Sequence, residues 1–199
     1  MTGQADVLPG RLALVADHLV LALRAGSSDG PPVFVVSWYV VTYAAGAPSG
    51  NVAFVRSPAL PSGELVVTDA PDLDRALRAR LRPKAWPLDD PDRPAVAGSF
   101  DRAPLHDGRL DARIVAGPHA VDVSWMELAV PIVATGRVGA DPPWDTSTVL
   151  LEAAGVSASI DGHAADGRPF PNPVWETWFG RPLSSALIAF AEVFREATT

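Results

Sequence analysis

Residues 161–182, DGHAADGRPFPNPVWETWFGRP, combine side chains that can bind a ligand with residues that restrict the backbone. Two tryptophans and two phenylalanines supply apolar contact surface, and four prolines limit the conformations of the chain between them. Asn172, Glu176 and Arg181 add polar groups that can fix the orientation of a bound molecule. We predict an ordered, non-repetitive loop that closes either over the core or over a ligand.

Aromatic residues outside this segment extend the candidate site. Trp38 lies in the most apolar stretch of the chain, and Trp125 lies in a second apolar stretch. In a small β-barrel such residues can line a ligand cavity at the mouth or fill the core, and both interpretations stay open. The candidate ligand-binding residues are Trp38, Trp125, Glu127, Asn172, Trp175, Trp178 and Arg181.

Glu127 is the carboxylate whose setting points most strongly to chemistry. It follows Trp125 in a stretch that carries no other charge before Gly136, and strict alternation places it on the interior face. An unpaired carboxylate there would cost several kcal/mol, so we expect a partner such as Arg181 or a ligand. The alternative is that a kink near Pro131 turns Glu127 outward. A buried Glu127 would suit general acid–base chemistry.

The sequence contains no motif that is typical of another catalytic chemistry. The chain lacks the G-x-S-x-G, H-E-x-x-H, P-loop and G-x-G-x-x-G motifs. Serine catalysis would need Ser124, Ser184 or Ser185 to meet a histidine and a carboxylate in space, which the sequence neither supports nor excludes. No two histidines are spaced as metal ligands are, and cysteine is absent, so we expect no metal site and no cofactor. The four histidines are His18, His106, His119 and His163.

Charge and composition narrow the choice of partners. The 199 residues carry a net charge of -7, without the cluster of cations that binding to phosphates needs, so we expect no nucleic-acid partner. One lysine stands beside fifteen arginines among abundant Ala, Gly and Pro, which is typical of a GC-rich bacterial genome. A small apolar ligand and a homo-oligomer are the partners that remain.

The sequence shows neither a secretion signal nor a membrane-spanning helix. The first ten residues lack a basic region followed by an apolar one. Residues 30–55 are uncharged, but their apolar part, 33–47, is too short to cross a bilayer of about 30 Å as a helix. We therefore expect a soluble, cytoplasmic protein with no membrane partner.

The elements that would position these residues are mostly strands. Residues 11–24 are apolar at nearly every position and fit a strand or a buried helix, and the Asp-Gly turn before 33–43 favours a β-hairpin. Short strands follow at 51–56 and 64–68. The clearest helix is 71–82, with Asp69 as its expected N-cap and apolar residues on one face.

The second half of the chain repeats the pattern of short strands and turns. Asp107-Gly108 predicts a hairpin between 99–105 and 109–115, and residues 121–128 alternate as a half-buried strand does. Residues 147–154 fit a helix or a strand equally well, and 156–160 fit a strand. For 184–196 we favour a C-terminal helix over a strand, because Leu187, Phe190, Ala191 and Phe194 have helical spacing.

These elements predict a mainly β (α+β) fold, a single antiparallel β-barrel or sandwich with one short helix near 71–82 and a possible C-terminal helix. We expect one domain over 1–199, with the loop 83–96 as a possible but disfavoured boundary. The layout resembles lipocalin-like barrels in broad architecture. Val36-Ser37-Trp38 stands where the lipocalin Gly-x-Trp signature would be, so the resemblance implies the architecture and no functional residue.

The leading hypothesis for function is binding of a small, largely apolar molecule in a barrel cavity lined by aromatic residues. One alternative is an enzyme that acts on such a molecule by general acid–base chemistry, using Glu127 with His119 or His163. Another is a non-catalytic homo-oligomeric or interaction module with the Trp- and Pro-rich loop as its interface. Whether the protein is an enzyme stays open at this point.

Overall fold

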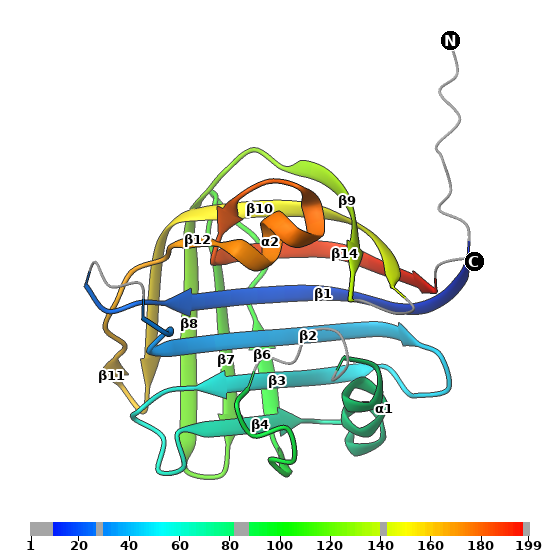
Figure 1. Cartoon of the computed structure of the whole chain (residues 1–199). Coiled ribbons are helices and arrows are strands. Elements are labelled where there is room, and N and C mark those ends of the chain that lie inside the picture. The colour runs from blue at the N-terminus through cyan, green and yellow to red at the C-terminus, as the bar shows by residue number, and fades with distance from the viewer. Residues whose placement is uncertain (1–9, 27–29, 82–87, 140–142, 197–199) are drawn as a thin grey trace.

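The first of two layers of strands is a sheet in which each strand runs antiparallel to its neighbours. A computed structural model describes residues 10–26, 30–81, 88–139 and 143–196. In Figure 1 the strands of this layer lie side by side across the front of the molecule. Their spatial order is β4 (Glu64–Thr68), β3 (Gly50–Arg56), β2 (Phe34–Ala44), β1 (Arg11–Leu23), β14 (Ala186–Glu196) and β10 (Trp144–Ile160).

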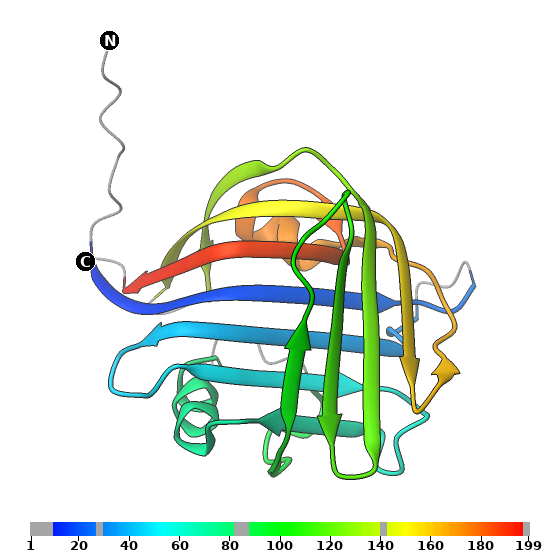
Figure 2. The same ribbon diagram turned by 180° about the vertical axis from the view of Figure 1, so that it is seen from behind.

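The second layer lies behind the first in the view of Figure 1, and Figure 2, seen from behind, shows its strands crossing those of the first layer. It consists of β6 (Ser99–Arg102), β7 (Leu110–Ala116), β8 (His119–Leu128) and the second half of β10. The first half of β10 pairs with β9 (Ile132–Val138) and the second half with β8, so β8 and β9 follow one another along one edge of β10. Pro131 lies at the break between them, which confirms the interruption expected there.

The ring of strands is nearly closed at Gly98. The segment β5 (Ala95–Ala97) pairs parallel with β4, and β6 pairs antiparallel with β7 directly after Gly98. A Cβ atom on Gly98 would lie 2.2 Å from the side chain of Val67, so the close approach at this corner requires glycine. The result is a nearly closed β-barrel, which decides between the expected barrel and sandwich, with one parallel pair because the helix α1 (Pro71–Leu81) connects β4 to β5.

Apolar side chains from both layers fill the space inside the barrel. Trp38 of β2 and Trp125 of β8 are among the largest of these side chains, and both are fully buried. The indole nitrogen of Trp38 donates to the side-chain oxygen of Asn51 over 3.0 Å, and the Trp38 ring contacts Phe100 at 5.3 Å between centroids. These two tryptophans therefore belong to the interior core.

A second core covers the outer face of the first layer, beneath α1 and the short helix α2 (Pro173–Phe179). Figure 1 shows α2 in front of this layer. Pro173 begins α2, Asn172 accepts a hydrogen bond from the backbone of Val174 as its N-cap, and Gly180 ends it in the left-handed conformation at φ 69°. The prediction of a wholly non-repetitive loop here was therefore wrong. The same segment also contains β11 (His163–Ala164) and β12 (Pro171–Asn172), and β13 (Leu183–Ser184) follows it.

The structure resolves most of the alternatives left open by the sequence. Residues 11–23 and 34–44 form the expected hairpin, 147–154 belong to β10, and the helix α1 matches the prediction for 71–82. Its expected cap was wrong, because the Asp69 carboxylate binds the backbone and side-chain nitrogens of Asn51. The segment 83–96 lies partly outside the described residues.

In the described part of the chain, no helix is long and apolar enough to cross a membrane.

The expected C-terminal helix is a strand. β14 pairs with β1 on one side and β10 on the other, and its residues before position 190 are buried on both faces. Ala191 has a φ of 47° and lies at a register shift in both pairings, which marks a β-bulge. Leu187 and Ala189 point to the outer face before the bulge, and Glu192 and Phe194 point to the same face after it. The bulge thereby gives the residues on this face a spacing that imitates a helix.

Candidate functional site

A pocket of about 440 Å³ lies between the outer face of the β1–β2 hairpin and the helix α2. We call it the outer-wall pocket. Its volume falls in the range of small-molecule sites, and most of its lining is apolar. The lining comprises His18, Val20, Ala22, Arg24, Pro32, Val35, Ser37, Tyr39, Arg56, Phe170, Asn172, Pro173, Val174, Trp175, Thr177 and Trp178.

Three polar side chains form a chain of contacts beside this pocket. Nε2 of His18 lies 2.8 Å from Oγ of Ser37, and Nδ1 of His18 lies 3.4 Å from Oε2 of Glu192. His18 and Glu192 are only 4% and 1% exposed, among otherwise apolar neighbours. Because an unpaired charge is costly at such depth, each of these two side chains depends on its contact with the other.

The strand register brings these three side chains together. Val20 pairs with Ser37 and His18 pairs with Tyr39 in the β1–β2 hairpin, so His18 and Ser37 lie on the same face of adjacent strands. Glu192 reaches this face through the bulge at Ala191. The Asp17 carboxylate stabilises the bulge by accepting the backbone N–H of Ala191 over 2.9 Å. A regular β14 would point Glu192 to the opposite side.

Aromatic rings hold the imidazole in place. The ring of Tyr39 stacks on His18 at 3.9 Å between centroids with 14° between the planes, and Trp175 meets His18 edge to face at 6.4 Å. The Trp175 indole nitrogen donates to the main-chain oxygen of Ser184, which fixes that ring. Burial and the nearby Glu192 carboxylate raise the pKa of the Tyr39 hydroxyl, and the interaction with Ser37 only partly opposes them. Tyr39 is therefore a neutral hydrogen-bond donor at physiological pH.

Positive charge lines another part of the pocket. The guanidinium of Arg24 lies 3.8 Å from the centroid of the Phe170 ring, and no acidic side chain of the described residues is within ion-pair distance of it. Arg56 shares its charge with Asp89, whose carboxylate is 2.8 Å away. The Nε atoms of both arginines are buried and have no hydrogen-bond partner in the described structure. Donors are therefore left over for an acidic group.

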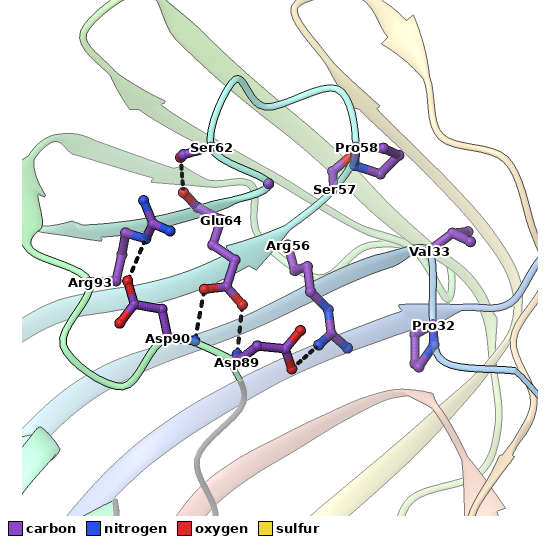
Figure 3. Close-up of a pocket in the computed structure, with 11 residues that line it drawn as sticks. Pro32, Val33, Arg56, Ser57, Pro58, Ser62, Glu64, Asp89, Asp90 and Arg93 are labelled. Atoms are coloured by element: carbon purple, nitrogen blue, oxygen red, sulfur yellow. Dashed lines mark hydrogen bonds and ion pairs between the residues drawn. The ribbon is translucent and has the colours of Figure 1, made fainter.

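Arg56 also lines a neighbouring open hollow of about 650 Å³, shown in Figure 3. The carboxylate of Glu64 points toward the loop there and accepts the backbone N–H groups of Asp89 and Asp90 over 2.6 and 3.1 Å. Arg93 pairs with Asp90 at 3.4 Å. These contacts hold the loop against β4 and already engage the carboxylates of Glu64, Asp89 and Asp90, so the hollow offers less to a ligand than the outer-wall pocket.

The structure divides the residues predicted from sequence into three groups. Asn172, Trp175 and Trp178 line the outer-wall pocket, Trp38 and Trp125 lie in the interior core, and Arg181 is exposed on the surface. Trp175 and Trp178 are 4% and 9% exposed. These two side chains therefore offer little exposed surface themselves.

The expected burial of Glu127 was wrong. Its side chain is exposed, and its φ of 54° breaks the alternation that would have turned it inward. His119 lies 2.9 Å from the Asp161 carboxylate and His163 is exposed. In the described part of the chain, no three His, Cys, Asp or Glu residues are grouped to hold a metal ion.

Several residues of the pocket escaped sequence reasoning, although two had a detectable signal. His18 and Asp17 are the polar residues inside the first apolar strand, and Ser37 is the first hydroxyl in the next one. Alternation along a hairpin could have placed His18 and Ser37 on a common face. Glu192 and Arg24 carried no such signal. Glu192 reaches the site because of the bulge in β14. Arg24 belongs to the site because residues 168–170 fold against it, with Arg168 forming a β-bridge to Arg24.

No protein-family model matches the chain, and no curated protein matches it. The function is therefore inferred from the geometry of the outer-wall pocket.

Proposed function

We propose that the protein binds a small, largely apolar molecule that carries an acidic group, and that the outer-wall pocket is its binding site. The observation that carries this proposal is the guanidinium of Arg24, which has no acidic partner among the described residues and lies in the wall of an apolar pocket of about 440 Å³. A ligand with both properties would bury apolar surface and neutralise this charge at the same time.

The apolar part of the ligand would lie against α2. Trp175 and Trp178 form one wall, and Val20, Ala22 and Val35 form the sheet opposite them. Burying a medium-sized apolar chain between these walls is worth roughly 25 cal/mol for each Å² removed from water. The indole rings are held in place beforehand, because Trp175 donates to Ser184 and contacts Trp178 edge to face at 5.2 Å. Little side-chain entropy is then lost on binding.

The acidic part would pair with Arg24. A guanidinium presents several N–H donors in a planar arrangement that matches a carboxylate, and its stacking on Phe170 leaves its edge available. Arg56, on the same pocket wall, has a buried Nε that also lacks a partner in the described structure. A neutral ligand of the same shape would leave these donors unsatisfied, so the pocket should discriminate against it.

The test compares straight-chain and aromatic carboxylic acids with their primary amides, using tryptophan fluorescence and thermal shift. We expect the acids to bind at least about tenfold more tightly than the amides, since a hydrogen bond to a charged group is worth roughly 1.5–3 kcal/mol. Arg24→Met should abolish this preference. Arg75→Met is the matched control, because Arg75 lies exposed on α1 outside the pocket. The proposal fails if no acid binds, or if Arg24→Met binds the acids as the wild type does.

A further inference from the structure

We infer that Ser37, His18 and Glu192 form a nucleophile, base and carboxylate that hydrolyse carboxylic esters in the outer-wall pocket. This inference rests on the proposed function, because the substrate would occupy the same pocket as the acidic ligand. It adds the substrate class: an ester with an apolar chain and a second, acidic group placed to reach Arg24. The product of hydrolysis would then be an acid of the kind proposed as ligand.

The geometry is that of an activated serine. The 2.8 Å between Ser37 Oγ and His18 Nε2 is hydrogen-bond distance, so the hydroxyl proton has an acceptor within reach. Glu192 lies 3.4 Å from the other ring nitrogen, where its carboxylate can hold the imidazole with Nδ1 protonated and Nε2 free to accept. Such contacts are often long in the absence of a substrate and shorten when one binds.

A purely structural role explains this cluster poorly. Nδ1 of His18 and Oε2 of Glu192 are buried and have no hydrogen bond of good geometry in the described structure. Well-packed apolar residues at such positions are often neutral or more stable than a buried charged pair. Their neighbours Leu14, Ala16 and Ala189 are already apolar. A buried polar cluster whose members His18 and Ser37 line a pocket is typical of a functional site.

The reaction balances with water as the only co-reactant. Ser37 Oγ attacks the ester carbonyl carbon while its proton passes to His18 Nε2, and the ester C–O bond breaks as that proton moves to the leaving alcohol. A water molecule then attacks the acyl group on Ser37 and gives a proton to His18, and the bond to Oγ breaks as the proton returns to Ser37. The net change is ester and water to carboxylic acid and alcohol.

The negative charge that develops on the carbonyl oxygen of the ester during the attack needs a hydrogen-bond donor. Tyr39 is two residues from Ser37 on the same face of β2, and its hydroxyl stays protonated. A neutral phenol can donate to an oxyanion without first losing a proton of its own. Tyr39 therefore has two roles in this scheme: its ring orients His18 by stacking, and its hydroxyl stabilises the intermediate.

The test uses two chromogenic esters of matched length with the full chain, the mono-4-nitrophenyl ester of adipic acid and 4-nitrophenyl hexanoate. We expect the acidic ester to react faster, and Ser37→Ala to lower its kcat/KM by at least about a hundredfold. An alkyl fluorophosphonate should modify Ser37 in the wild type, as seen by peptide mass spectrometry. Ser157→Ala is the control, because Ser157 is exposed on β10 outside the pocket.

Glu192→Gln separates a positioning role from a structural one. It should lower kcat and leave KM unchanged, because the substrate does not touch Glu192. Equal turnover by the wild type and Ser37→Ala, or no turnover and no adduct in the wild type, overturns the inference. If carboxylic acids still bind in that case, the proposed function survives. If no acid binds to the wild type, both proposals fail together.

Discussion

The indole nitrogen of Trp125 donates a hydrogen bond of 2.9 Å to the main-chain oxygen of Val20. This bond joins the second layer of the barrel to the first, across an interior filled by apolar side chains. The side chain of Val20 points the other way and lines the outer-wall pocket. The interior core thus packs against the inner face of the sheet whose outer face forms the wall of the candidate site. This packing keeps the sheet rigid while its outer face stays open to a ligand.

Replacing Trp125 by Phe should destabilise the fold. Phenylalanine keeps most of the buried ring but removes the donor, so the free energy of unfolding should fall by roughly 1–3 kcal/mol. Urea unfolding followed by circular dichroism measures the change, with an unchanged slope as the sign that two-state behaviour is kept. The variant should still bind a carboxylic acid at low denaturant. A transition midpoint equal to that of the wild type would show that the bond contributes nothing.

Gly136 lies where α2 approaches β9. A Cβ atom there would be 2.0 Å from the main-chain oxygen of Trp178 and 2.8 Å from the ring of Phe179. Gly136→Ala should therefore push α2 away from the sheet, lower the stability by roughly 1–3 kcal/mol and weaken ligand binding. Isothermal titration with a bound acid and thermal unfolding measure the two effects.

The matched control for Gly136 is Gly155→Ala in β10. Its added Cβ would meet Met126 at 3.4 Å, an ordinary contact, and Gly155 does not need a positive φ. This variant should be close to neutral, because alanine also restricts the unfolded chain. If both variants lose the same stability, the contact between Gly136 and α2 is not the cause.

Asp161 should make the stability depend on pH. Its carboxylate lies 2.9 Å from Nδ1 of His119 and accepts the backbone N–H of Ala120 over 2.7 Å, and these contacts lower the pKa of Asp161. A lowered folded-state pKa means that the stabilisation is complete above the unfolded pKa and is lost as pH falls through the folded value. Asp161→Asn should thus melt lower than the wild type near about pH 7, and the difference should vanish near about pH 2.

Asp101→Asn provides the comparison for Asp161. Asp101 is exposed, and none of the described side chains forms a hydrogen bond or ion pair with its carboxylate. This substitution should leave the melting temperature unchanged at both pH values. A difference between Asp161→Asn and the wild type that persists undiminished in acid would contradict the assignment.

The barrel was predictable because its signals are local. The Asp107-Gly108 turn and the alternation through 121–125 define neighbouring strands without knowledge of the rest of the chain. The C-terminal strand was misjudged because the bulge at Ala191 gives Leu187 and Phe194 the spacing of a helix. No sequence pattern distinguishes a bulge of this kind from a turn of helix, since tertiary pairing with β1 and β10 decides between them.

The candidate site was predictable only where its residues share one segment. Trp175 and Trp178 stood out because they lie three residues apart between prolines, and both line the pocket. His18, Ser37 and Glu192 come from three strands, and their meeting depends on the hairpin register and on the bulge. Alternation along its strand predicted that Glu127 points to the interior, but its positive φ turns the side chain to the surface. Where the backbone is irregular, its local dihedral angles set the direction of each side chain, and the alternation of a regular strand does not predict that direction.

The buried pair of His18 and Glu192 predicts an unusual mutational cycle. His18→Leu alone leaves Glu192 without its partner, and Glu192→Leu alone does the same to His18, so each should lower the stability by roughly 3–5 kcal/mol. The double variant replaces both groups by apolar ones among apolar neighbours, and should regain most of that loss or exceed the wild type. Urea unfolding of the four proteins measures the coupling. A double variant less stable than either single variant would show that the pair itself stabilises the barrel, and would remove the stability argument for a functional role.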